Sequence, residues 1–288
     1  MNPADLTDAT FGPVAVVVTA DRVADYVAAT GDGAGRWDVT APPGFASALL
    51  FAVAGDFLWD PRIAEYTRTL LHLDQAFTYQ RLPMIGESVT VAGAVTRVRE
   101  RSGTFFVTFE ADATSGGDLV VASTSTFLMS AQAAGDPGPD PGEPDVTQRA
   151  LNELPGRVEA AVGPLPPLAK SASRADLIRY AAATKDFNPI HWDHASARAG
   201  GAPGIIVHGL LMLAWAAQAA AVVGRGSDPV AHLKVRFRNP LLPAEQAMVE
   251  AVVGDIAVDG GDAQVGLRVV RDGEALVTGA ASVRLPEE

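Results

Sequence analysis

The chain has 288 residues, of which 48% are hydrophobic and 19% charged, and its formal net charge is −12. This is a globular composition, with enough apolar material for one large domain or two ordinary ones. The acidic excess argues against nucleic acid or a membrane as a partner. The absence of cysteine excludes disulfides, thiolate catalysis and cysteine-based zinc sites, and it suits a reducing cytoplasm, where we expect the protein.

The sequence of the first half predicts two helices followed by four strands. An amphipathic helix is expected at 20–29, and a Pro43-Gly44 turn then leads into an apolar helix at 45–54. β-rich runs follow at 71–79, 88–99, 104–114 and 119–128, with Gly116-Gly117 as a hairpin signal between the last two. One buried helix followed by an antiparallel sheet suggests a sheet wrapped around that helix.

The segment 131–167 is rich in proline, glycine and acidic residues, so a loop or linker is expected there. Beyond it, a helix is expected at 174–183 and strands at 230–238, 247–258, 263–271 and 275–285. The apolar stretch 204–224 is long enough to cross a bilayer. His208 and Gln218 would be costly in lipid, and flanking Lys/Arg clusters are missing, so a buried helix is the better interpretation.

The two halves form an internal repeat. Tyr26 and Thr30 recur as Tyr180 and Thr184, Pro43-Gly44 recurs as Pro203-Gly204, and His72-Leu73 recurs as His232-Leu233. The offset between equivalent residues drifts only from 154 to 160. We therefore expect an N-terminal domain at 1–132, a linker at 133–167 and a C-terminal domain at 168–288, paired as a pseudo-dimer within one chain. Whether two such chains also pair as a homodimer is left open by the sequence.

The run Asp186-Phe187-Asn188-Pro189-Ile190-His191 is the strongest candidate for chemistry. A residue before proline is pushed out of the α region, so a helix should stop near Asn188, leaving Asp186 and His191 to flank a tight turn. Such a pair can aim a carboxylate and an imidazole at one water molecule and carry acid–base chemistry near neutral pH. The alternative is a purely structural role, in which Asp186 caps the end of the helix and His191 lies on the surface. A metal site with Asp193 and His194 is a further alternative, although the spacing fits no helical ligand pair.

The stretch from Tyr180 to His191, with Ala197 beyond it, resembles the hydratase-2 motif of the MaoC-like family. Val207-His208-Gly209-Leu210 resembles the start of that family's central helix. The family comprises (R)-specific enoyl-thioester hydratases and 3-hydroxyacyl-thioester dehydratases with a hotdog fold. The resemblance implies an α+β double hotdog, two tandem halves each with a central helix wrapped by an antiparallel sheet. Lys185 departs from the pattern, because the family usually has glycine just before the catalytic aspartate.

The resemblance also implies roles for individual residues. Asp186 and His191 would hold the water that adds across a trans-2-enoyl thioester or leaves an (R)-3-hydroxyacyl thioester, and the amide of Gly209 would bind the thioester carbonyl. Neither a metal nor another cofactor is implied, and the partner would be a thioester of coenzyme A or of an acyl carrier protein. A hotdog thioesterase and a non-catalytic acyl-binding subunit are the alternatives. Asn188 and His208 are expected at the substrate site, although Asn188 could simply fix the turn and His208 could simply cap the helix.

The repeat provides an internal control for these roles. Asp32 aligns with Asp186, but the residues after it contain no equivalent of His191, and Ala48 stands where the second half has His208. The first half is therefore expected to be non-catalytic and to help form an acyl tunnel, whose length depends on aromatic residues that the sequence does not place in space: Phe45, Phe51, Phe57 and Trp59.

Basic residues alternate with apolar ones at the expected strand 230–238. Lys234, Arg236 and Arg238 would share one face of it. In so acidic a protein this stripe could meet the phosphates of coenzyme A or an acidic carrier protein. The alternative is an ordinary solvated strand face.

Overall fold

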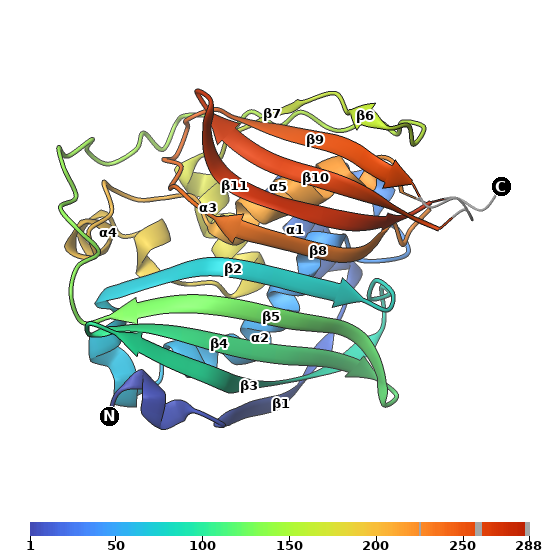
Figure 1. Cartoon of the computed structure of the whole chain (residues 1–288). Coiled ribbons are helices and arrows are strands. Elements are labelled where there is room, and N and C mark those ends of the chain that lie inside the picture. Colours follow the sequence, from blue (N-terminus) through green and yellow to red (C-terminus); the bar gives the residue numbers. More distant parts are fainter. Residues whose placement is uncertain (225, 257–260, 286–288) are drawn as a thin grey trace.

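A computed structural model describes residues 1–224, 226–256 and 261–285. The four expected helices are present, with α2 extending further and α5 shorter than predicted, whereas α4 was not predicted from the sequence (Figure 1). They are α1 (Ala20–Thr30), α2 (Ala46–Leu58), α3 (Arg174–Thr184), α4 (His194–Ala199) and α5 (Gly209–Ala221). Short 3-10 helices occur at Pro3–Leu6, Ala34–Arg36, Pro43–Phe45, Pro61–Arg68 and Pro189–His191.

The strands form one antiparallel sheet of eleven strands in the described ranges, in the order β1-β3-β4-β5-β2-β8-β11-β10-β9-β6, with β7 also on β9. The eight predicted strands are confirmed within a few residues, except that residues 257 and 258 of the expected strand 247–258 lie outside the described residues. The sequence did not predict β1, β6 and β7. The strands are β1 (Thr10–Val17), β2 (Thr69–Tyr79), β3 (Ser88–Arg101), β4 (Thr104–Ser115), β5 (Asp118–Ser130), β6 (Gly163–Pro164), β7 (Leu168–Lys170), β8 (Val230–Phe237), β9 (Ala247–Ile256), β10 (Asp262–Arg271) and β11 (Glu274–Arg284).

The two halves meet where β2 pairs with β8, which we call the seam. Gln75 lies directly opposite Val235. The repeat offset of 160 residues makes these two positions equivalent, so a pseudo-two-fold axis passes between them. Tyr26 and Tyr180, also equivalent in the repeat, pack with ring centroids 6.0 Å apart. The expected double hotdog with an intrachain pseudo-dimer is therefore confirmed.

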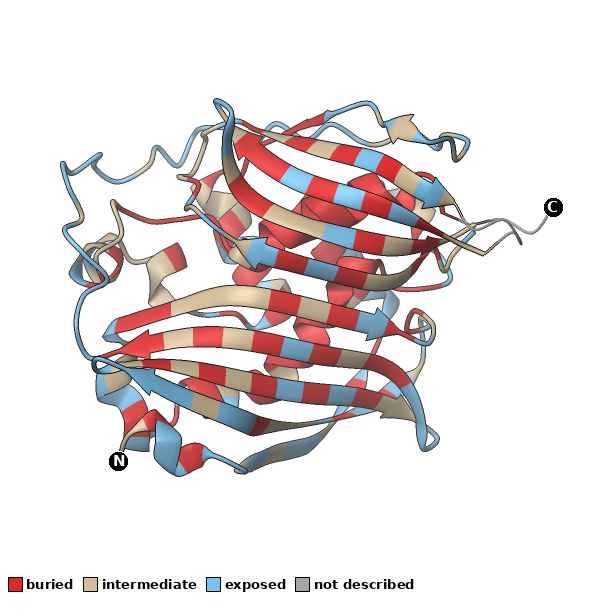
Figure 2. Ribbon diagram, viewed as in Figure 1, coloured by how far each residue is buried: buried red, intermediate tan, exposed pale blue. Residues whose placement is uncertain are grey.

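Each half wraps its part of the sheet around one central helix, α2 in the first half and α5 in the second (Figure 1). Buried and exposed residues alternate along the strands because successive side chains point to opposite faces (Figure 2). Most of α2 and nearly all of α5 are buried, which confirms the interpretation of 204–224 as a core segment. Among the described residues, no helix combines the length and the apolar character needed to cross a membrane.

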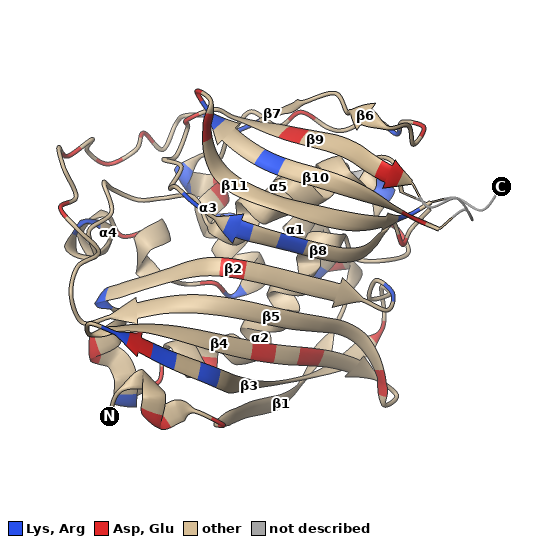
Figure 3. Cartoon of the chain, viewed as in Figure 1, with Lys and Arg blue, Asp and Glu red and all other residues tan. Residues whose placement is uncertain are grey.

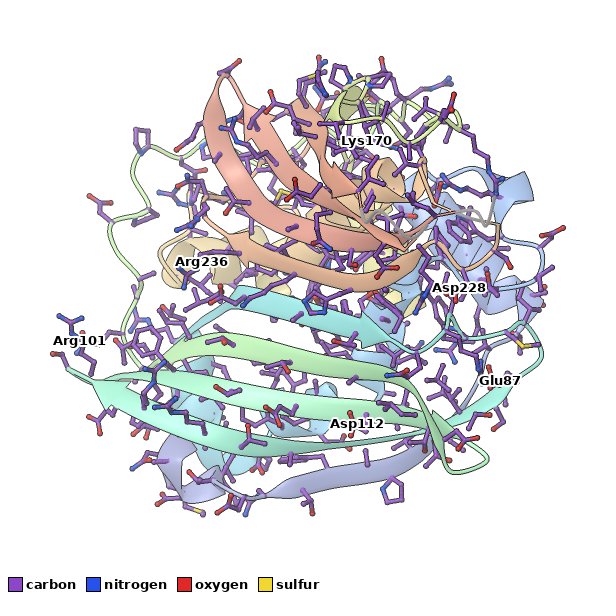
Figure 4. The ribbon with its side chains drawn as sticks, turned by 45° about the vertical axis from the view of Figure 1, so that its right-hand side comes forward. Glu87, Arg101, Asp112, Lys170, Asp228 and Arg236 are labelled. Atoms are coloured by element: carbon purple, nitrogen blue, oxygen red, sulfur yellow. The ribbon has the colours of Figure 1, made fainter. Side chains whose placement is uncertain are left out.

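The segment between the halves is more ordered than the expected linker. Its last part forms β6, which pairs with β9, and Asn152 forms a bridge with Lys170 of β7. The Lys170 side chain is fully buried, and its ammonium group donates to the Gly31 carbonyl at the end of α1 at 3.0 Å (Figure 4). This contact ties β7, with which Asn152 of the segment pairs, to the first half, since a buried ammonium group needs such an acceptor.

Candidate active site

The turn after α3 carries the sequence motif. The Ser173 hydroxyl accepts the N–H of Asp176, whose carboxylate accepts the N–H of Ser173, and this capping box fixes the start of α3. The helix stops at Thr184 because Lys185 adopts φ 71°, a left-handed conformation. Gly31, with φ 59°, ends α1 in the same way. The position before the aspartate therefore favours glycine for a backbone reason.

Asn188 shapes the rest of the turn. Its Oδ1 accepts the N–H of Ile190 at 3.3 Å, and its Nδ2 donates to the Leu70 carbonyl on β2 at 3.3 Å. The backbone N–H of Asn188 donates to Asp186 Oδ1 at 3.4 Å. Asn188 therefore holds the motif against the first half of the chain. It also lines the cavity described below, so both of its expected roles are sterically available.

Asp186 is buried, with 7% of its surface exposed. Burial raises the pKa of this carboxyl to about 7, against the smaller lowering effect of the Asn188 N–H. The ammonium group of Lys185 is turned toward the ring of Phe187, 6.0 Å from its centre. A carboxyl with a pKa near 7 can both accept and return a proton at neutral pH.

His191 is also buried, so the alternative in which it is a surface histidine without a catalytic role is wrong. Its Nδ1 lies 2.8 Å from the Ile206 carbonyl oxygen. A carbonyl can only accept, so Nδ1 carries the proton and Nε2 keeps a free lone pair. Burial lowers the pKa of His191 to about 4, against the opposing effect of the Ile206 carbonyl. The imidazole is therefore a neutral hydrogen-bond acceptor at physiological pH.

His208 lies behind His191 and does not line the cavity, contrary to the expected substrate contact. The two rings stack with centroids 3.7 Å apart and planes 24° apart. His208 Nε2 donates to the Asp186 carbonyl at 3.3 Å, and its buried Nδ1 has no hydrogen-bond partner among the described residues. Burial and then His191 lower the pKa of His208 well below its usual value. Both imidazoles are thus held neutral.

Asp186, His191 and His208 each offer one ligand-type atom within 4.8 Å of the other two. Stacking places the two imidazole planes nearly parallel, whereas a shared zinc ion needs nitrogen lone pairs that converge on it at about 2.0–2.1 Å. The other suggested metal ligands are engaged elsewhere, because Asp193 caps α4 through Ser196 and His194 binds Asp140. The cluster therefore suits proton transfer better than metal binding.

A cavity of about 280 Å³ opens beside this cluster, with Asp186, Asn188 and His191 in its wall. Strand pairing at the seam stops at Asp74 opposite Arg236, and the residues beyond that pair line the cavity on both sides. These residues are Leu70 to Leu73 of β2, Phe237 at the end of β8, and Arg238 to Pro240 after it. The cavity thus lies where the two halves separate, and both halves build its wall.

Gly209 is the first residue of α5 and also lines the cavity. The first N–H groups of a helix have no intrahelical acceptor and carry partial positive charge. A Cβ atom at Gly209 would lie 3.0 Å from the Phe237 ring, so only glycine leaves this amide accessible without shifting the aromatic wall. The expected carbonyl-binding role is compatible with this position.

The basic stripe is divided by the structure. Arg238 lines the cavity, and its Nε donates to Thr278 Oγ1 at 3.3 Å. Lys234 and Arg236 do not line it; they lie on the exposed face of β8, where Arg236 forms an ion pair with Asp74 at 2.8 Å. Figure 3 shows basic positions along β8 beside an acidic position on β2. An exposed ion pair of this kind is what an ordinary solvated strand face provides. Of the three cations, only Arg238 is placed to meet a ligand in the cavity.

The expected aromatic tunnel is only partly present. Phe51 lines the cavity, whereas Phe45 packs on Tyr26, Phe57 stacks on Phe109 and Trp59 is partly exposed. The sequence also missed several cavity residues. His72 packs between Phe127 and Phe237, and burial lowers its pKa to about 3. The repeat marked His72 only as the equivalent of His232, and nothing in the sequence showed that it faces this cavity.

Among the described residues, the position in the first half that is equivalent to the motif has no comparable cavity. Trp37 is 3% exposed, and its Nε1 donates to Asp32 Oδ2 at 2.8 Å, so the ring occupies the space beside the aspartate. The Arg36 guanidinium donates to the Ala221 carbonyl, and Gln218 donates to the Thr30 carbonyl at 3.1 Å. The remaining space is about 10 Å³, room for about one water molecule.

Comparisons with known proteins agree with this picture. Residues 157–273 match the MaoC like domain, and residues 6–124 match the FAS1-like, dehydratase domain region. The (R)-specific enoyl-CoA hydratase of Aeromonas caviae is 32% identical over 128 residues, which cover 43% of this chain and 95% of that protein. The 3-hydroxyacyl-thioester dehydratase X of Mycobacterium tuberculosis is 28% identical over 236 residues, 81% of this chain and 76% of that protein. A solved MaoC-like dehydratase superposes with a TM-score of 0.81 at 20% identity, covering 99% of this chain and all of that one.

The fold is a double hotdog, and the buried Asp–His motif in the cavity wall marks the candidate active site. The chain belongs to the MaoC-like dehydratase family. Its matches to the UPF0336 proteins of Streptomyces griseus, S. coelicolor and S. avermitilis span 65%, 68% and 67% of their lengths, about two thirds in each case.

Proposed function

We propose that the protein is a hydro-lyase that reversibly hydrates trans-2-enoyl thioesters to (R)-3-hydroxyacyl thioesters, at a single site in its second half. The observation that carries this proposal is the buried pair Asp186 and His191 in the wall of a mainly apolar cavity. The named activities of the Aeromonas and Mycobacterium relatives support it. The substrate would be a thioester of coenzyme A or of an acyl carrier protein.

The two residues divide the work according to their pKa values. Asp186, with a pKa of about 7, takes a proton from water while the oxygen of that water attacks the β-carbon of the enoyl group. His191, neutral and with Nε2 free, accepts the second hydrogen of the water and orients it. The Asp186 carboxyl then returns its proton to the α-carbon, which regenerates the site. Dehydration follows the same steps in reverse.

The negative charge that develops on the thioester oxygen needs a donor. The Gly209 N–H at the start of α5 would supply it, because the group lines the cavity and has no intrahelical acceptor. His208 acts as a positioning residue in this scheme, since it stacks on His191 and binds the Asp186 carbonyl. The first half, for which we propose the limits 1–132, contributes cavity wall rather than chemistry.

Product analysis with purified protein and crotonyl-CoA tests the activity. Formation of (R)-3-hydroxybutyryl-CoA is expected. Release of free acid and thiol would instead identify a thioesterase, and binding without any product would identify an acyl-binding subunit.

The pH dependence of kcat/KM tests the division of roles. Asp186 must be ionised to take a proton, so the rate is expected to rise as pH increases through about 7 and then to level off. His191 imposes no change in this range, because its pKa of about 4 keeps it neutral. A rate that falls as pH rises through 7 would mean that the protonated carboxyl is the active form, contrary to the scheme.

A further inference from the structure

The segment 134–143, which we call the strap, crosses the outside of the second half and passes α4 on its way between the two sheets (Figure 1). It leaves β5 of the first half and follows the segment 197–204, which comprises the last three residues of α4 and the loop after them; we call this segment the 197–204 loop. Ala197 and residues 200–203 of this loop line the catalytic cavity, as does Ala134 of the strap itself. The strap therefore lies against the outer side of one cavity wall.

Two backbone contacts hold the strap against this wall at close range. The Ala134 N–H donates to the Gly200 carbonyl at 2.9 Å. A Cβ atom at Gly201 would lie 2.8 Å from the backbone nitrogen of Gly135, so only glycine permits this approach. Gly204 faces Pro141 in the same manner, with a would-be Cβ 3.2 Å away. Gly201 is thus required by the close approach of the strap.

Asp140 connects the strap to α4 through two side chains. Its carboxylate accepts a hydrogen bond from His194 Nε2 at 2.9 Å and lies 3.6 Å from Arg198 Nε. Arg198 also donates to the carbonyl of Gly138 at 2.9 Å and to that of Pro203 at 2.8 Å. The same guanidinium therefore joins the strap to the cavity loop, and Asp140 holds it in place.

We propose that Asp140 is a positioning residue for substrate binding, which fixes the 197–204 loop as a wall of the cavity through His194 and Arg198. The strap is then a specificity element and not a passive connection. The catalytic turn 186–191 is held separately, by Leu70 and Ile206. Loss of the Asp140 contacts should consequently weaken binding of the substrate without disturbing the dyad. This inference rests on the proposed hydratase function for its kinetic readout.

Asp136 offers a matched control within the strap. Asp136 accepts the N–H of Gly138 at 2.9 Å, and Asp140 accepts that of Gly142 at 2.8 Å, so both form the same local turn. Asparagine can accept the same N–H in either place. Of the two, Asp140 contacts α4. Asp140→Asn therefore removes the negative charge beside His194 and Arg198 and puts an N–H donor in place of the Oδ2 acceptor that faces Arg198, whereas Asp136→Asn alters no contact with α4.

The experiment compares kcat and KM for crotonyl-CoA in the full chain carrying either substitution. Asp140→Asn is expected to raise KM about tenfold with kcat changed less than twofold, because a wall that binds ground state and transition state alike has been loosened. Asp136→Asn should leave both constants unchanged. Hydrogen exchange at the Ala134 amide should become faster in Asp140→Asn only.

An unchanged KM in Asp140→Asn, or equal effects of the two substitutions, would overturn the proposal. A fall in kcat as large as the rise in KM in Asp140→Asn, together with a lowered melting temperature, would show that Asp140 has a merely structural role. This result would also overturn the proposal. If the wild-type chain has no hydratase activity, the proposed function fails on its own. In that case the dissociation constant of butyryl-CoA, a saturated thioester, replaces KM, and it should rise about tenfold in Asp140→Asn alone.

Discussion

The two ends of the seam are equivalent in the repeat but differ in construction. At one end β2 and β8 separate beyond Asp74 and Arg236, and a cavity with a buried carboxyl fills the gap. At the other end the Arg284 guanidinium donates to the carbonyls of Tyr79 at 2.5 Å and Val230 at 2.8 Å, and binds the Asp228 carboxylate at 3.1 Å. Figure 4 shows Asp228 and Arg236 toward opposite ends of β8. The duplicated sheet thus leaves a cavity at one end of the seam, whereas the Arg284 guanidinium fills the space at the other end.

The contrast extends to the groups around each aspartate. Asp186 lies next to two neutral imidazoles, and its burial raises the pKa of the carboxyl to about 7. Asp32 is covered by Trp37, which donates to it. A buried carboxyl of raised pKa is destabilising for the fold when ionised, so its presence beside the cavity points to function there.

The largest expected effect separates the two aspartates. Asp186→Asn removes the proton acceptor and should lower kcat about 10³-fold, within the range that general acid–base groups contribute. Asp32→Asn keeps an acceptor oxygen for only one of the two donors Trp37 and Gly33, but the site lies away from the catalytic cavity, so kcat should change less than twofold. Steady-state assays with crotonyl-CoA provide both values, and circular dichroism checks that each variant is folded. Comparable losses in the two variants would mean that both halves are catalytic.

His208 aligns with Ala48 in the repeat, so His208→Ala places in the second half the alanine that the first half has at this position. Loss of the stacked ring frees His191 to tilt, so kcat should fall about 10–30-fold, and the pH midpoint of kcat/KM should move because the surroundings of Asp186 change. His232→Gln, at an exposed contact with Thr78, is the control and should change neither value. A kcat for His208→Ala equal to that of the wild type would remove its positioning role.

Arg284 tests whether the closed end is structural. Arg284→Ala leaves the carbonyls of Tyr79 and Val230 without their donor and should reduce the free energy of unfolding by about 1–3 kcal/mol. Because the cavity lies at the other end of the seam, kcat for crotonyl-CoA should stay within twofold of the wild type. Urea unfolding measures the first quantity, and a kcat that falls with it would show that the two ends are coupled.

The smallest expected effects concern the residues that end α3 and α1. Lys185→Gly relieves a left-handed conformation and should raise the free energy of unfolding by about 0.5–1 kcal/mol. The reverse change, Gly31→Ala, should destabilise by about 1–3 kcal/mol, because its Cβ would lie 2.2 Å from the Asn152 side chain. Thermal unfolding of both variants checks the opposite signs. Destabilisation by Lys185→Gly would show that the lysine side chain has a role of its own.

Much of the fold followed from the sequence, because the repeat and the alternation of apolar residues are local patterns that extend over whole strands. The duplicated Pro-Gly turns indicated that a central helix follows each of them, although α5 begins only at Gly209, and the missing histidine after Asp32 indicated which half carries the dyad. β1, β6 and β7 were missed, since β6 and β7 have only two and three residues and β1 contains Gly12-Pro13, a combination that weakens a strand pattern.

The site was less predictable, because its remaining parts depend on distant contacts. The tautomer of His191 is set by Ile206, fifteen positions away, and Asn188 is held by Leu70 in the other half. The stripe of Lys234, Arg236 and Arg238 looked uniform in sequence, yet the end of pairing at the seam leaves only Arg238 at the cavity. The strap had the composition of a flexible linker, and its position against α4 could not be inferred from that composition.

The number of ligand sites per chain tests the central comparison most directly. Isothermal titration of the wild-type protein with butyryl-CoA should give one site per chain, because the cavity lies at one end of the seam and Arg284 and Trp37 close the other. Two equivalent sites per chain would contradict the assignment of a single functional end.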